Sequence, residues 1–193
     1  MKKLISLALV LAMALSILAG CGATADNGGN NETAAPASAL EVLENIWALF
    51  GDDEKFPVMG GDFETGAMDA PAVWKSELLV DLSYSLQLPE AEMAKVADAA
   101  TMIHMMNANT FTGAAYHLTG DVSADEFADA LKEGILAKQW ICGMPDTLVV
   151  INVDGQYVIA AYGADDLVET FKDNALSALD GAEAIIDTPV VEG

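Results

Sequence analysis

The chain contains no arginine, and its eight lysines are its only strongly basic residues. Against thirty aspartates and glutamates, they leave a formal net charge of −22 at pH 7. Such a field repels polyphosphate backbones, and without arginine there is no planar guanidinium to grip a phosphate. Nucleic-acid binding is therefore excluded, and cationic or basic partners are favoured over acidic ones.

Cysteine and histidine are also scarce, with two of each. If one cysteine carries a lipid, as argued below, no disulfide can form within the chain, and the fold must depend on its hydrophobic core. The sequence has no His-Glu-x-x-His motif and no glycine-rich phosphate loop after a predicted strand. We therefore expect neither enzymatic activity nor a bound cofactor.

The chain begins with a leader pattern. Met1-Lys2-Lys3 is positively charged and the run from Leu4 to Ala19 is apolar, as in an export signal. The run has sixteen residues, fewer than the roughly 20 that a membrane-spanning helix needs. Leu18-Ala19-Gly20-Cys21 then resembles the lipobox of bacterial lipoproteins, in which the cysteine thiol is lipidated and the leader is removed. The resemblance makes Cys21 the first mature residue and the lipid anchor.

This interpretation places the chain on the outer face of the cell membrane, while plain secretion and a retained anchor helix stay open. Without the leader, six lysines and thirty acids give a charge of −24, so lipid rather than charge must hold the domain at an anionic bilayer. The stretch after Cys21 has the composition of a flexible tether with a reach of roughly 20–24 Å. We divide the chain into a leader (1–20), a lipidated cysteine with its linker (21–37), one folded domain (38–188) and a tail (189–193).

Capping and turn residues predict the elements of the domain. Ser38 with Glu41 and Ser123 with Glu126 are capping boxes that open helices. Asp154-Gly155 predicts a tight hairpin. We expect helices over 38–51, part of 77–86, 89–100, 123–142 and 166–179, and strands over 102–106, 111–118, 148–153, 156–162 and 184–186. The acidic, glycine-rich stretch 52–66 is expected to be a loop rather than a calcium site, because its oxygens lack EF-hand spacing.

The second half of the chain repeats the order strand, strand, helix. Ala114-Ala115-Tyr116 and Ala160-Ala161-Tyr162 fall at the same point of each unit. The two hairpins can pair into one antiparallel sheet of about four strands, with amphipathic helices covering one face. The predicted fold is therefore α+β, with a helical lead-in before the two units.

Cys142 is the candidate for redox chemistry. The stretch Trp140-Ile141-Cys142-Gly143-Met144-Pro145 weakly resembles a thioredoxin active site, where tryptophan precedes Cys-Gly-Pro-Cys. Here the tryptophan is one residue too far away and the second cysteine is missing. The stretch also follows a predicted helix, whose C-terminal dipole disfavours a thiolate. We expect a small buried residue at a helix stop, and keep thiol-redox function as the alternative.

Methionine and histidine cluster before the polar turn. Met102, His104 and Met106 share one face of the predicted strand and offer thioether and imidazole ligands for Cu(I). His117 on the next strand could approach His104 across the hairpin. Because methionine is also a common core filler, we expect packing rather than a metal site here.

One resemblance covers roughly residues 38–180. The lipobox, the tether, the helical lead-in, the stretch Met105-Met106-Asn107-Ala108-Asn109-Thr110-Phe111 and the closing strand-strand-helix unit are together similar to a group of lipoproteins of unknown function from anaerobic Gram-positive bacteria. Some members carry the label "bacteriocin transport accessory protein". The resemblance implies a small α+β lipoprotein domain and supplies no catalytic residues.

We therefore expect a monomeric, membrane-anchored binding or accessory domain with an unidentified protein or small-molecule partner. The polar turn with Asn107, Asn109, Thr110 and Phe111 is the expected contact loop, although it can equally be no more than a hairpin loop.

Overall fold

The computed structural model describes residues 35–62, 64, 66–75 and 85–190. The predicted leader, Cys21, most of the linker, almost all of the predicted helix over 77–86 and the last three residues of the tail lie outside these ranges. The helices are α2 (Ala39–Trp47), α4 (Glu90–Met93), α5 (Ala124–Leu136) and α6 (Asp165–Ala178). The strands are β1 (Val58–Gly60), β2 (Ala67–Met68), β3 (Ala72–Trp74), β4 (Val96–His104), β5 (Phe111–Leu118), β6 (Thr147–Val153), β7 (Tyr157–Gly163) and β8 (Ala182–Pro189).

The described strands form one antiparallel sheet in the order β2-β1-β4-β5-β7-β6-β8, and β3 also pairs with β4. The predicted hairpins β4–β5 and β6–β7 are present and pair through β5 and β7. Ala114 lies opposite Ala160, so the two equivalent residues of the predicted repeat meet at its centre. Asp154 and Gly155 both have positive φ, as their two-residue turn requires.

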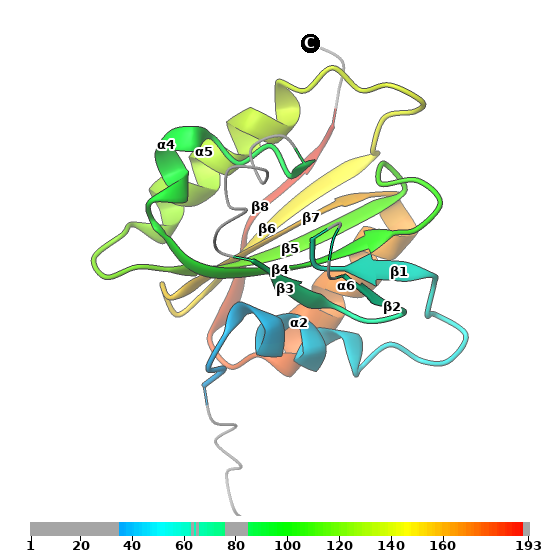
Figure 1. The fold of residues 1–193 in the computed structure, drawn as a ribbon, viewed down its shortest axis with the longest axis horizontal. Helices are drawn as coiled ribbons and strands as arrows, with labels where there is room; N and C mark the ends of the chain where they lie inside the picture. Colours follow the sequence, from blue (N-terminus) through cyan, green and yellow to red (C-terminus); the bar gives the residue numbers. More distant parts are fainter. Residues whose placement is uncertain (1–34, 63, 65, 76–84, 191–193) are drawn as a thin grey trace, which may run out of the picture. The chain divides into compact units, whose positions relative to one another are not determined.

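Each face of the sheet carries its own hydrophobic core. On one face, α2 and α6 contribute Ile46 and Phe171 to a core that also contains Phe111. On the other face, α5 contributes Phe127 and Leu131. Figure 1 shows α5 and α2 on opposite sides of the sheet. The predicted sheet of about four strands with helices on one face is therefore wrong in both respects.

The chain path explains why the helices lie on both faces. The connection β5–α5–β6 passes over β7, and β7–α6–β8 passes over β6, so each joins parallel strands. Both connections step in the same direction across the sheet, but they start from strands that point in opposite directions. Crossovers of this kind are almost always right-handed. If both crossovers are right-handed, α5 and α6 must lie on opposite faces of the sheet, even though the order strand, strand, helix is the same in both units.

The helix predicted over 89–100 is reduced to α4, and β4 starts at Val96 rather than at Met102. The alanine-rich segment favours a helix locally, but it lies between β5 and the short strands β1 and β3. Ala99 and Ala100 are buried in the two different cores. Tertiary pairing therefore overrides local propensity, and β1 likewise forms inside the stretch expected to be a loop.

Helix starts are predicted better than helix ends. The Ser38 hydroxyl accepts the Glu41 N–H at 3.2 Å, and the Ser123 hydroxyl accepts the Glu126 N–H at 3.3 Å, so the capping serines are confirmed. In contrast, α5 stops at Leu136 instead of continuing toward Cys142. None of the helices in the described ranges is long and apolar enough to span a bilayer.

Candidate functional site

A groove of about 640 Å³ lies beside the end of β4, next to the segment that follows α5. Its volume is within the range of small-molecule sites. Four separate parts of the chain line it: β1, the segment before α4, the end of β4 with the β4–β5 turn, and the segment after α5. The apolar lining residues are Met59, Ile103, Met105, Met106, Ala108 and Ile141, and the polar ones are Ser85, Gln87, His104, Asn107, Asn109, Lys138 and Gln139.

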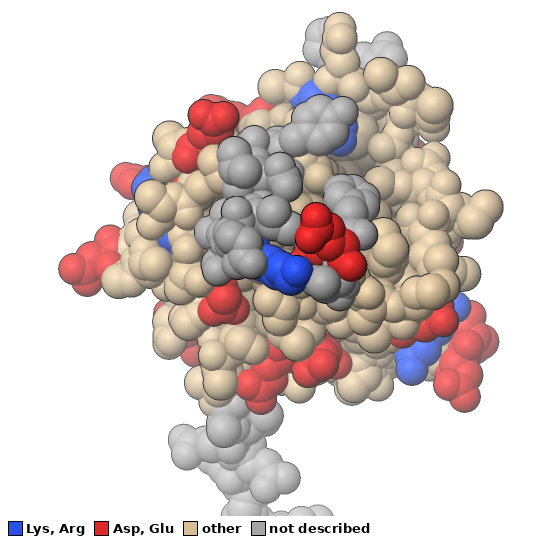
Figure 2. Space-filling view, in the orientation of Figure 1, with Lys and Arg blue, Asp and Glu red and all other residues tan. Residues whose placement is uncertain are grey.

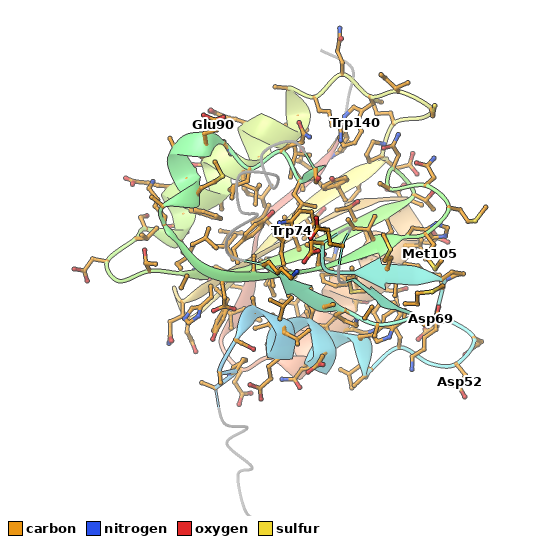
Figure 3. The ribbon with its side chains drawn as sticks, in the orientation of Figure 1. Asp52, Asp69, Trp74, Glu90, Met105 and Trp140 are labelled. Carbon is orange, nitrogen blue, oxygen red and sulfur yellow. The ribbon has the colours of Figure 1, made fainter. Side chains whose placement is uncertain are left out.

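None of the described residues that line the groove is acidic. Neither 99–120 nor 134–145 contains an aspartate or a glutamate, in a chain that has thirty. Figure 2 shows mainly tan side chains at the upper right, whereas red ones lie at the left, near the centre and along the lower rim. Figure 3 shows Trp140 and Met105 on that side and Glu90 on the other.

Large apolar side chains are exposed at the groove. Met106 is 84% exposed and Ile141 is 79% exposed, the two highest values among the large hydrophobic residues that the structure describes. Met105 and Met144 are also exposed. Apolar side chains that are this exposed add little to the hydrophobic core, and together they make this region a candidate interaction surface.

The predicted contact turn holds the neighbouring loop in place. The Asn109 side-chain amide donates to the Ile141 carbonyl at 2.9 Å and to the Gly143 carbonyl at 2.5 Å. The Asn107 amide donates to the Cys142 carbonyl at 3.4 Å, while its oxygen accepts the Asn109 N–H at 2.9 Å. These side chains therefore fix one wall of the groove.

The other two members of the predicted contact turn face inward or bond within the fold. Phe111 is fully buried and packs against Phe56 and Phe171, with ring centroids 5.1 and 5.4 Å apart. The Thr110 carbonyl accepts the Ala164 N–H at 2.9 Å. Phe111 is therefore a core residue, and only the asparagine part of the turn borders the groove.

Cys142 is exposed rather than buried as expected, and it has a positive φ of 65°. It lies in the irregular segment between Leu136 and β6, and does not begin a helix as the thiol of a thioredoxin-like site does.

Lys138 is the only cation among the described lining residues. Its ammonium lies 4.5 Å from the centroid of the Trp140 ring, and no described carboxylate is within ion-pair distance of it. Burial lowers its pKa from the usual lysine value, because the charged form loses hydration. Of the described lysines, only Lys95 and Lys172 form ion pairs with carboxylates, so Lys138 shares the lack of such a partner with Lys55, Lys75 and Lys132.

The candidate copper ligands are not brought together. Met102 is fully buried in the core beneath α2 and α6, whereas Met106 lies beyond the strand in solvent. The His104 ring stacks on Phe56 with centroids 5.7 Å apart, and its Nδ1 accepts the Met106 N–H at 3.2 Å. The described residues also contain no group of three His, Cys, Asp or Glu side chains suited to a metal.

His117 does not approach His104, since the two lie at opposite ends of the β4–β5 ladder. Instead, His117 Nδ1 lies 2.7 Å from Asp98 Oδ2, and the ring stacks on Tyr157. Asp98 Oδ1 accepts the Ala39 N–H at 2.8 Å, and the Tyr157 hydroxyl donates to the Pro36 carbonyl at 2.7 Å. This cluster fixes the point where the chain enters the domain.

Tyr157 has no acid–base role in that cluster. Its pKa is raised by burial and then by the carboxylates of Asp98 and Glu41, so the phenol stays protonated and remains a donor. Because the hydroxyl proton is directed to Pro36, it is not presented to His117. The cluster is therefore structural.

Sequence reasoning missed Met59, Gln87 and Lys138 as groove residues, because they come from segments far from the flagged turn. The lack of aspartate and glutamate in residues 99–120 and 134–145 was the sequence signal that could have indicated the groove. No protein-family model, no curated protein and no solved structure matches the chain.

Proposed function

We propose that the chain is a lipid-anchored, extracytoplasmic binding protein without catalytic activity, and that the groove beside β4 holds its ligand. The observation that carries this proposal is the exposure of the apolar side chains of Met106 and Ile141 at a groove whose described lining residues include no acid. Covering such side chains is favourable by roughly 25 cal/mol for each Å² removed from water.

The arrangement of the domain supports the proposal. The chain enters the domain at Pro36, whose carbonyl accepts a hydrogen bond from the Tyr157 hydroxyl. Tyr157 lies at the start of β7, opposite His117 of β5. The groove borders the opposite end of the ladder, near Thr112. Five residues of extended strand separate these ends by about 16 Å. The first described residues of the domain, at Pro36, therefore lie at the other end of this ladder from the groove.

A photo-crosslinking experiment in intact cells tests the proposal. A benzophenone amino acid replaces Ile141 in the full-length protein, and in a second strain it replaces Leu176, which is 41% exposed on α6. We expect a discrete adduct from position 141 and none from position 176, because only the first lies at the groove. The absence of an adduct at 141, or equal adducts at both positions, would contradict the proposal.

Thiol-redox function through Cys142 remains the second candidate, favoured by the exposure of the thiol. The same experiment separates the two functions. If binding is the function, Cys142→Ser leaves the adduct at position 141 unchanged, because the groove wall is held by the carbonyl of residue 142 and not by its sulfur. Loss of the adduct in this variant would favour the thiol.

A further inference from the structure

The polar side chains around the groove are not equally available to a ligand. The Asn109 amide is bonded to two carbonyl oxygens of the adjoining loop, and the Asn107 amide to a third. Lys138 is different, because its ammonium lies over the Trp140 ring and no described carboxylate is within ion-pair distance of it. It is therefore the charged donor that a ligand in the groove would meet.

A small inorganic anion is not enough to explain the site. The mature chain carries a charge of −24, and its field repels free anions from the solvent. An anion that binds here must gain affinity from elsewhere. Met59, Met105, Met106 and Ile141 supply an apolar lining, and each methylene buried against it contributes about fourfold to affinity.

We infer that the groove binds an anionic amphiphile, a single carboxylate or phosphate head joined to an unbranched apolar chain. Lys138 holds the head, and the methionines with Ile141 cover the chain. The inference rests on the groove being the ligand site proposed above. Flexible, polarisable methionine side chains suit an apolar chain that has no fixed shape.

The reduced hydration of Lys138 supports this assignment. Burial lowers the pKa of the ammonium because the charged form has lost water, and a bound carboxylate or phosphate would replace that water with a charge-assisted hydrogen bond. The amphiphile could arrive as a free molecule or as a lipid within a bilayer. Both sources share the same head and chain.

The test compares two ligands that differ only in the head. Decanoate and decanol, both below their aggregation limits, are titrated by calorimetry into the full mature chain carrying Cys21→Ser, so that no attached lipid competes. We expect decanoate to bind about tenfold more tightly than decanol, the value of one charge-assisted hydrogen bond. Lys138→Gln should remove this preference, so that decanoate and decanol bind to the variant with similar affinity. Lys132→Gln on α5, outside the groove lining, is the matched control and should retain the preference.

The outcomes separate this inference from the proposed function. Equal binding of decanoate and decanol by the wild-type chain overturns the role of Lys138 and leaves the groove as a binding site. If neither ligand binds, vesicles of phosphatidylglycerol and of phosphatidylcholine are tested. Binding to the anionic vesicles alone, lost in Lys138→Gln, supports the inference with a bilayer lipid as the source. Binding to none of these overturns both the inference and an apolar ligand for the groove.

Discussion

Replacing Gly134 with alanine should lower the free energy of unfolding by about 1–2 kcal/mol, although alanine is the better helix former. The exchange gains about 1 kcal/mol of helix propensity on α5. However, a Cβ at this position would overlap the Gln87 carbonyl oxygen, which belongs to backbone and cannot rotate away. Relieving such overpacking costs about 1–3 kcal/mol, and the upper part of that range exceeds the gain.

Urea denaturation of the mature chain measures this effect. Glu133→Ala is the control, because Glu133 is exposed on the preceding position of the same helix and its loss should change the stability by less than about 0.5 kcal/mol. If the Gly134→Ala protein is as stable as the wild type, α5 does not pack closely against the Gln87 carbonyl in the segment before α4. Because Gln87 lines the groove, the same variant should also weaken ligand binding.

Replacing Cys21 with serine should abolish lipid anchoring. The chain would then be found in the medium or with its leader uncleaved, because the thiol that we expect to receive the lipid is gone. Each buried methylene of an acyl chain contributes roughly 0.8 kcal/mol, and two or more chains are needed for stable anchoring. After removal of the leader, no other feature of the acidic chain is expected to hold it at an anionic bilayer.

Fractionation with an antibody against the domain measures this change, and mass spectrometry of the mature N-terminus identifies the lipid. Cys142→Ser is the matched control, since it removes the other cysteine and should leave the protein on the membrane. If the Cys21→Ser protein still fractionates with the membrane as a mature, acylated species, the anchor has been assigned to the wrong residue.

The sequence predicted the parts of the fold that depend on neighbouring residues. Ser38 and Ser123 cap their helices and Asp154-Gly155 turns its hairpin, because each uses contacts within four residues. The start of β4 was not predictable in this way. Its alanines favour a helix, and only their burial between β5 and the edge strands makes them a strand.

Which face of the sheet each helix covers depends on the topology of the whole sheet. Local amphipathicity shows that α5 and α6 each bury one side, but the side of the sheet follows from strand order and crossover hand. Short strands such as β1 and β2 carry too few residues for a periodic pattern. Hydrophobic patterning alone could therefore predict only the longer strands, which gave a sheet of about four.

The candidate site was predicted only in part. Asn107 and Asn109 were flagged as a polar turn, but their role in holding the Ile141–Gly143 loop is a long-range contact. Lys138 lies far from them in sequence, and no spacing motif connects it to the turn. Such a groove becomes visible only when the fold has brought its walls together.

The most direct test of the ligand site is an amide chemical-shift map. The ¹⁵N-labelled mature chain carrying Cys21→Ser is titrated with decanoate, and each backbone amide is followed. We expect the largest shifts in 85–87, 103–109 and 138–141, the described segments that line the groove together with Met59. Shifts centred on α2 and α6, or none at saturating ligand, would contradict the placement of the site.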